Sequence, residues 1–296
     1  MKRKQSHEMR HWRTGLFMAA PVLLGFIFLV LYPVLSVIRD SFTSYNPLSG
    51  DAAFIGVDNY TRLVQDETAL EVAKNTVIFA CILVPVNMAL ALFLAVLLNL
   101  HFKGRTTFRA IFFSPVIVST VAWTIVWKYI LQDDGPFNYF LGLSGVDGAN
   151  WLRENPWPMI SVVMVQVFKN LGMNMIFFLA ALQGVPEEMY ESSEIDGANR
   201  WQQFKKITLP FISPTILLVG ILTIAGAFQV FAQVLLLTGG GPGLSTTVLS
   251  YYIFINAFQI FDLGYASALA VCLFIFVMGL TVAQWQIRTR WVFREV

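Results

Sequence analysis

Apolar residues gather in six long runs along this chain of 296 residues, and short polar stretches separate the runs. Each run is close to the roughly 20 residues that an α-helix needs to cross about 30 Å of hydrocarbon. The runs are continuously apolar, unlike the alternating strands of a membrane barrel, and every backbone group in lipid needs the internal partner that a helix supplies. We therefore expect six transmembrane helices, near residues 13–38, 76–100, 110–131, 158–182, 211–236 and 265–287.

Composition agrees with this pattern. Hydrophobic residues make up 56% of the chain and charged residues only 13%, whereas about 25% of a typical soluble domain is charged. The sequence therefore predicts an all-α polytopic membrane protein. The net charge of +2 combines a basic side and a mildly acidic side, so it does not indicate nucleic acid.

Lys and Arg residues lie mostly on one side of the predicted spans. The richer side holds Lys2, Arg3, Lys4, Arg10, Arg13, Lys103, Arg105, Arg109, Arg200, Lys205, Lys206, Arg288, Arg290 and Arg294. The other side holds Arg39, Arg62, Lys74, Lys128 and Arg153. Because cytoplasmic loops carry the excess of basic residues, we expect a cell-membrane protein with both termini in the cytoplasm. The first run is too long for a signal-peptide core and no small-residue cleavage site follows it, so we expect a retained span.

Several kinds of chemistry are disfavoured by the residues present. The histidines, His7, His11 and His101, lie in basic segments without carboxylates at metal-ligand spacing, and Cys81 and Cys272 lie in apolar spans. The glycine-rich run at 238–243 is not followed by GK[ST], so it is not a P-loop. We therefore expect no catalytic site, no metal and no cofactor bound by this chain.

The charged segment 185–210 separates the fourth and fifth runs. Pro186 suits the first turn of a helix, and Glu187, Glu188 and Glu191 would complement the positive end of its dipole. Gly197 interrupts this helix, and a second short helix is expected beyond it. We expect Pro210 to mark the entry to the fifth span, because a proline pushes the preceding residue out of helical geometry. An amphipathic loop lying on lipid headgroups is an alternative that periodicity alone leaves open.

The segment resembles the EAA motif of the membrane subunits of binding-protein-dependent ABC importers. The pattern runs E-A-A, three residues, G, nine residues, I, one residue, L-P. Its positions are taken here by Glu191, Ser192, Ser193, Gly197, Ile207, Leu209 and Pro210. Two serines thus replace two alanines. Further similarity to importers of the maltose and glycerol-3-phosphate type occurs at Leu236-Leu-Thr-Gly-Gly-Gly-Pro and Gly264-Tyr-Ala-Ser-Ala, and it covers roughly residues 14–290.

This resemblance implies a type I ABC importer permease fold and a mechanical role for the segment 185–210. In the family the segment couples the membrane subunits to an ATPase, so we call it the coupling segment. The residues that it would use are Glu191, Ser192, Ser193, Asp196, Gly197, Ala198, Ile207, Leu209 and Pro210. The implied organisation is a basic N-terminus (1–13), a first span and loop (14–75), a type-1 core (76–287) and a tail (288–296). The implied partners are a second, homologous permease, two ATPase subunits that carry MgATP, and an extracytoplasmic binding protein.

Polar side chains inside the predicted spans are candidates for the solute pathway, since such groups usually face the bundle interior or an aqueous cavity. We expect Gln166, Asn170 and Asn174 to share one helical face, and Gln229 and Gln233 another. Thr120 is a further polar candidate, and the family resemblance implies that Thr120, Gln166, Asn170 and the region of Gln229 line the sugar site. Amides suit sugar hydroxyls because they both donate and accept hydrogen bonds. Hydrogen bonding between helices is the alternative role for these residues.

Lys169 is the basic residue that lies deepest within a predicted span. It is expected either to pair with an anionic substrate or to extend its ammonium towards the interface.

Three functions suit a membrane protein with this pattern of spans: an importer permease, an ion-coupled secondary transporter and an intramembrane enzyme. An ion-coupled secondary transporter would normally show carboxylates inside the spans, and an intramembrane enzyme would need a catalytic constellation there. Neither is present in the six runs, so the sequence favours the permease of a sugar importer. Secondary transport of small polar solutes is the alternative.

Overall fold

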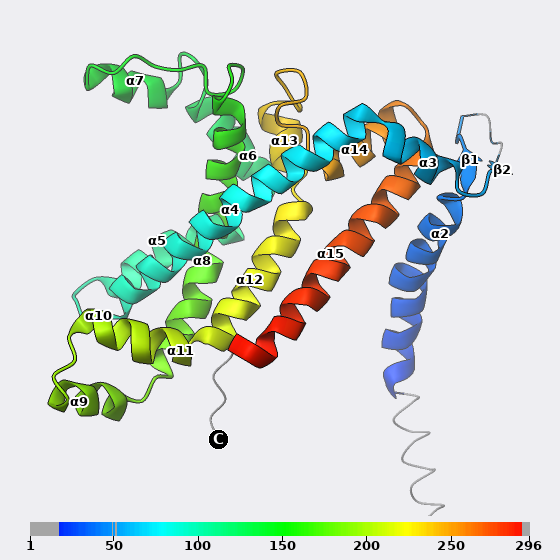
Figure 1. The fold of residues 1–296 in the computed structure, drawn as a ribbon. Helices are drawn as coiled ribbons and strands as arrows, with labels where there is room; N and C mark the ends of the chain where they lie inside the picture. The colour runs from blue at the N-terminus through cyan, green and yellow to red at the C-terminus, as the bar shows by residue number, and fades with distance from the viewer. Residues whose placement is uncertain (1–17, 49, 51, 292–296) are drawn as a thin grey trace, which may run out of the picture. The chain divides into compact units, whose positions relative to one another are not determined.

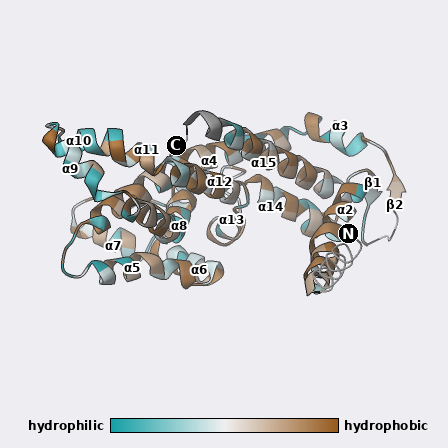
Figure 2. Cartoon of the chain, turned by 90° about the horizontal axis from the view of Figure 1, so that it is seen from below, coloured by the Kyte–Doolittle hydropathy of each residue, from teal (hydrophilic) through white to brown (hydrophobic). Residues whose placement is uncertain are grey.

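The computed structural model describes residues 18–48, 50 and 52–291, with side chains up to residue 286, and it is almost entirely helical (Figure 1). The N-terminal basic residues named above, with His7 and His11, lie outside the described residues, as do the tail residue Arg294 and the side chains of Arg288 and Arg290. The expected all-α membrane architecture is confirmed. Its long apolar helices carry hydrophobic residues along much of their length, whereas α9 and α10 are largely hydrophilic (Figure 2).

Four helices in the described part of the chain are long and apolar enough to cross a membrane. They are Met18–Asp40, which includes the π-helical turn η1 (Ile27–Leu31) and α2 (Tyr32–Asp40); α4 (Glu67–Asn99); α8 (Trp157–Gln183); and Leu263–Gln286 of α15 (Leu263–Trp291). Two bent pairs raise the number to six if each pair crosses once. These pairs are α5 (Arg105–Ile117) with α6 (Thr120–Ile130), and Arg200–Phe211 with α12 (Ser213–Phe228). The structure is therefore compatible with the expected six spans.

The chain forms two compact units. Unit 1 contains the chain up to Gln65 and Ile253–Cys272. In it, β1 (Thr43–Tyr45) pairs antiparallel with β2 (Ala52–Phe54), and α3 (Asp58–Gln65) follows. The buried Asn59 side chain donates to the backbone oxygens of Ser41 and Thr43, both at 2.9 Å, and so fastens α3 to the start of the hairpin.

A second set of contacts in unit 1 joins residues that are far apart in sequence. Arg62 Nη1 lies 2.6 Å from Asp262 Oδ2, and the guanidinium lies 4.0 Å from the centre of the Tyr265 ring. The sequence predicted only a loop between the first and second spans. In the structure, α3 of that loop is held in place by the segment that leads from η3 (Ile255–Gln259) into α15.

Unit 2 contains Asp66–Tyr252 and the chain from Leu273 onwards. Its core is the packing of α4 against α8. Ala91 and Ala95 lie one turn apart on α4 and are fully buried, which lets the helices approach closely, and Met175 and Phe178 of α8 fill the same cluster. The remaining elements of this unit are α7 (Pro136–Leu143), α9 (Glu187–Ile195), α10 (Arg200–Gln203), η2 (Phe204–Thr208), α11 (Leu209–Phe211), α13 (Ala232–Leu237) and α14 (Leu249–Phe254), the last of which runs into unit 1.

Two expected spans are interrupted. The expected helix 110–131 breaks at Val118 and Ser119, where α5 and α6 meet at 104°. The expected helix 211–236 ends at Phe228, and α13 begins only at Ala232. The second span is longer than expected, because Asp66 caps α4 by accepting hydrogen bonds from the amides of Thr68 and Ala69.

Candidate functional site

The coupling segment begins with the helix that the sequence predicts. Pro186 is the N-cap of α9, and Glu187 and Glu188 lie in the first turn, where negative charge is favoured. Gly197 has a φ of +77°, a conformation that side chains with a Cβ rarely adopt, and it ends the helix as expected. Asn199 then starts α10 with a capping box, in which its side chain and that of Gln202 each accept a hydrogen bond from the other's backbone amide.

Pro210 lies close to the entry to the fifth span, but the expectation that Leu209 leaves helical geometry was wrong. Leu209 is helical, with φ of −60° and ψ of −46°. The π-helical turn η2 precedes it and pairs the amide of Leu209 with the oxygen of Phe204, so the proline falls in the first turn of α11, where its missing N–H is tolerated. The chain bends by 67° after Phe211 instead.

Side-chain hydrogen bonds lock the two short helices of the coupling segment together. Tyr190 Oη lies 2.8 Å from Thr208 Oγ1, which ties α9 to η2. Ser193 Oγ donates to the oxygen of Tyr190 at 2.8 Å and accepts from Gln203 Nε2 at 3.0 Å. Ser193 stands at one of the two positions where the EAA pattern has alanine, so here the serine has a structural role. The sequence did not single out Tyr190 or Gln203, because their partners become visible only when the turn is folded.

The locked segment presents an exposed surface. Glu191, Ser192 and Asp196 are exposed, while Ala198, Ile207, Leu209 and Pro210 are partly buried. Two large apolar side chains join this surface, since Ile195 is 89% exposed and Trp201 is 70% exposed. Trp201 also stacks on Phe204, with ring centres 5.8 Å apart. Large apolar groups that are this exposed beside charges are typical of protein interaction sites. Ile195 was missed because it is a single apolar residue in a charged turn.

Three of the six pathway candidates are used between helices. Asn174 Nδ2 of α8 donates to Asn87 Oδ1 of α4 at 2.5 Å and to Thr223 Oγ1 of α12 at 3.0 Å. Gln233 Nε2 of α13 donates to Gln166 Oε1 of α8. All five side chains are buried. The alternative role, hydrogen bonding between helices, thus describes Gln166, Asn174 and Gln233 in this structure.

The other three candidates remain accessible. Thr120 and Asn170 are partly buried and Gln229 is exposed, and their side chains make no hydrogen bond to any part of the chain that the structure describes. The expected face shared by Gln229 and Gln233 was wrong, because the break between α12 and α13 separates them.

The expected extension of Lys169 towards the interface was wrong, whereas its pairing with an anionic substrate stays a prediction. Its ammonium is directed to backbone carbonyls where α5 ends: Nζ lies 2.6 Å from Pro115 O, 2.5 Å from Val118 O and 3.4 Å from Val116 O. The side chain is buried, so it does not extend to an interface. The break between α5 and α6 leaves carbonyls without helical partners, and the lysine of α8 supplies donors to them.

No cluster of His, Cys, Asp and Glu suited to a metal ion occurs among the described residues. His101 is exposed, and the thiols of Cys81 and Cys272 are free.

These features define an integral membrane protein with a rigid, exposed coupling segment between its spans. Residues 87–289 match the family of binding-protein-dependent transport system inner membrane components, and the chain belongs to this family. It is 34% identical to the sulfoquinovosyl glycerol transport system permease SmoG of Agrobacterium fabrum over 90% of this chain and 87% of that one. It is 31% identical to the trehalose/maltose permease MalF of Thermococcus litoralis over 92% of each chain, and 33% identical to the lactose permease LacF of Rhizobium radiobacter over 95% and 94%.

The fold is also similar to solved structures. A chain of a bacterial ABC transporter involved in the import of the acidic polysaccharide alginate superimposes with a TM-score of 0.85 at 25% identity, covering 97% of this chain and 99% of that one. The expected family of carbohydrate-type ABC permeases and the expected permease fold are therefore confirmed.

Proposed function

We propose that this chain is the permease subunit of an ATP-driven importer and that it translocates a sugar or sugar derivative delivered by an extracytoplasmic binding protein. The observation that carries the proposal is the coupling segment of a chain that belongs to the binding-protein-dependent family. Hydrogen bonds through Tyr190, Ser193 and Gln203 hold its two helices as one body. A rigid body transmits a displacement from an attached ATPase that a mobile loop would absorb.

The sugar class is supported by the relatives and by the accessible polar groups. The relatives named above carry names that refer to trehalose and maltose, lactose, and sulfoquinovosyl glycerol. Thr120, Asn170 and Gln229 offer hydroxyl and amide groups to solute hydroxyls without the desolvation cost of a charge. We assign these three to solute contact, and Gln166, Asn174 and Gln233 to positioning the helices around the path.

The partners follow from the same reasoning. The chain pairs with a second, homologous permease and with two ATPase subunits, which bind MgATP, so this chain needs no cofactor and no catalytic site of its own. It resides in the inner membrane with both termini in the cytoplasm, because the basic residues gather on that side. This orientation places the coupling segment on the cytoplasmic face.

The first test is purification of the tagged protein from native membranes, with its companions identified by mass spectrometry. The wild type is expected to recover an ATPase and a second permease. Gly197→Val forces a β-branched residue into a φ of +77° and is expected to reduce ATPase recovery at least about tenfold. Gly145→Val is the matched control, because Gly145 has a φ of +74° and open space around it, as Gly197 does, but lies before α8.

Two results would contradict the proposal. A wild-type protein that is recovered without any ATPase would contradict the proposed assembly with ATPase subunits. If Gly197→Val recovers as much ATPase as Gly145→Val and the wild type do, the coupling segment does not bind the ATPase.

A further inference from the structure

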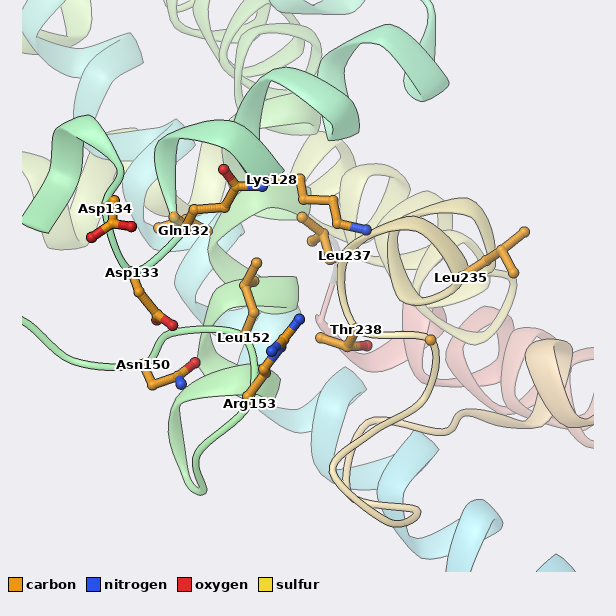
Figure 3. Close-up of a pocket in the computed structure, with 12 residues that line it drawn as sticks. Lys128, Gln132, Asp133, Asp134, Asn150, Leu152, Arg153, Leu235, Leu237 and Thr238 are labelled. Carbon is orange, nitrogen blue, oxygen red and sulfur yellow. The ribbon is translucent and has the colours of Figure 1, made fainter.

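A cavity of about 490 Å³ lies in unit 2 (Figure 3), and Figure 1 shows α6 and α13, which line it, at the end of that unit remote from α9 and α10. It is lined by residues at and after the end of α6, by the loop before α8 and by the end of α13. The 27 residues of α8 separate this loop from the coupling segment by about 40 Å, at a rise of about 1.5 Å per residue. If the coupling segment is cytoplasmic, the cavity therefore lies on the outer side. Its volume falls within the range of about 300–1,000 Å³ that is usual for small-molecule sites.

The wall of the cavity is fixed by its own hydrogen bonds. Asn138 Nδ2 donates to the oxygens of Asp133 and Ala149, both at 3.0 Å, and Asn138 Oδ1 accepts from Trp151 Nε1 at 2.6 Å. Gly148 packs so tightly on this asparagine that a Cβ would lie 2.6 Å from Asn138 Cγ. The backbones of the two lining loops are thus joined before any ligand arrives, which reduces the entropic cost of ordering them on binding.

Charge is divided across the cavity. Figure 3 shows the ends of Lys128 and Arg153 on the side of Thr238, and the carboxylates of Asp133 and Asp134 on the opposite side. No ion pair joins any of these four charged side chains to another residue in the described ranges. Lys128 lies in the last turn of α6, where the helix dipole favours a cation. The dipole of α6 does not explain why a second cation, Arg153, lies at the cavity, because Arg153 is in the loop before α8.

The polar groups surround an apolar floor. Leu131 and Leu152 also line the cavity, and both are buried. Asn150 adds an amide on the side of the carboxylates (Figure 3). Carboxylates and amides accept hydrogen bonds from hydroxyl groups, and Lys and Arg bind anionic groups through charge-assisted hydrogen bonds. The apolar floor suits the carbon faces of a sugar ring.

We propose that this cavity binds a short acidic saccharide, with its anionic group at Lys128 and Arg153 and its hydroxyl groups at Asp133 and Asn150. The inference rests on the proposed function and narrows its substrate class. Gln233, which donates a hydrogen bond to Gln166, lies one turn of α13 from the lining residue Leu237, so we place the cavity next to the proposed path between the helices. The acidic sugar therefore occupies a receiving site before it enters the path between the helices.

The test uses the whole transporter, purified with its companion subunits in lipid nanodiscs. The probes are uronic-acid disaccharides and trisaccharides from partially hydrolysed pectate and alginate, with galactobiose and mannobiose as uncharged counterparts. Binding is measured by saturation-transfer NMR. We expect the acidic probes to bind and the neutral probes to bind at least about tenfold more weakly. The double variant Lys128→Gln with Arg153→Gln is expected to lose at least about tenfold in affinity for the acidic probes.

The matched control is Lys103→Gln with Arg105→Gln, which removes one cation from the connection between α4 and α5 and one from the first residue of α5, and which should leave binding unchanged. Equal binding of acidic and neutral probes, absence of acidic binding, or unchanged affinity in the Lys128 and Arg153 variant would overturn the inference. So would a double variant that loses only its affinity for the binding protein, since the cavity would then receive a protein side chain.

The proposed function fails by a separate result. If no ATPase accompanies the wild-type chain, the importer proposal falls whatever the cavity binds. If the ATPase is recovered with the wild-type chain but the double variant keeps its wild-type affinity for the acidic probes, the importer stands and the acidic-saccharide site falls.

Discussion

The Nζ atom of Lys169 in α8 lies 2.5 Å from the carbonyl oxygen of Val118, at the point where α5 gives way to α6. A lysine on one helix thus stabilises the end of another helix, and the sharp bend between α5 and α6 depends on this cross-connection.

Replacement of Lys169 tests that dependence. In Lys169→Met the carbonyls of Pro115 and Val118 lose their donor, and since a hydrogen bond to a charged group contributes about 1.5–3 kcal/mol, we expect a clear fall in thermal stability. The measurement is the unfolding temperature in detergent by intrinsic fluorescence. Lys74→Met removes an exposed lysine from α4 and should leave that temperature unchanged. A Lys169→Met protein as stable as the wild type would refute the capping role.

Gly172 allows α8 to pass close to α5. A Cβ at this position would collide with the carbonyl oxygen of Phe112 and would lie 2.8 Å from Phe113 Cα. We expect Gly172→Ala to destabilise the protein by at least about 1–3 kcal/mol, the usual cost of overpacking. Its control is Gly226→Ala in α12, where a Cβ meets nothing within 4 Å and the helix should gain up to about 1 kcal/mol. Gly172→Ala should therefore lower the unfolding temperature and Gly226→Ala should raise it. If both variants shifted it in the same direction, the close approach of α8 to α5 at Gly172 would be contradicted.

The bond between Ser193 and Gln203 should be measurable as a coupling energy. Ser193→Ala leaves the buried amide of Gln203 without its strongest partner, so we expect a cost of about 0.5–1.5 kcal/mol and faster hydrogen exchange in α9. Ser192→Ala, at the exposed neighbouring position, should change neither the stability nor the hydrogen exchange of α9. A double-mutant cycle with Gln203→Ala that shows no coupling would mean that the two helices are held by other contacts.

Trp201 and Ile195 should dominate the binding of the ATPase. Because large exposed aromatic side chains are frequent interaction hot spots, we expect Trp201→Ala to weaken ATPase affinity at least about tenfold without lowering the unfolding temperature. Leu143→Ala in α7, a residue that is 69% exposed, is the control and should bind the ATPase normally. The readout is ATPase binding to immobilised permease; undiminished binding by Trp201→Ala would place the interface elsewhere.

Asn170 and Asn174 lie one turn apart on α8 and should respond differently to mutation. Asn170→Ala is expected to raise the KM for uptake with no loss of stability, since its side chain is partly exposed. Asn174→Ala should lower the unfolding temperature, because it leaves Asn87 and Thr223 without their shared partner. Both variants are measured for uptake kinetics and for unfolding temperature. The assignment of Asn170 to solute contact and of Asn174 to helix positioning would be disproved if both variants changed only the KM or only the unfolding temperature.

The sequence predicted those features that depend on local signals. The long apolar helices follow from hydropathy, and α9 with its end at Gly197 follows from a proline, acidic residues and a glycine at suitable spacing. These signals act within a few residues, so they can be recognised without the fold.

Features set by distant contacts could not be predicted. The break at Val118 is stabilised by a lysine 51 residues away. The helix that follows the hairpin of unit 1 is held by the contact of Arg62 with Asp262, which lies 200 residues further along the chain. Periodicity placed Gln166 and Asn174 on one face of α8. Only the packed structure shows that Gln166 is hydrogen-bonded to Gln233 and that Asn174 is hydrogen-bonded to Thr223.

The internal hydrogen bonds of the coupling segment bear on its transfer between permeases. The bonds that shape it through Tyr190, Ser193, Asn199 and Gln203 all join residues between positions 190 and 208. A short stretch of gene therefore encodes both the docking surface and the scaffold that holds it. Under the proposed function, residues 190–208 transplanted into another permease are expected to carry the ATPase-docking surface together with its own scaffold, while the solute path stays that of the recipient.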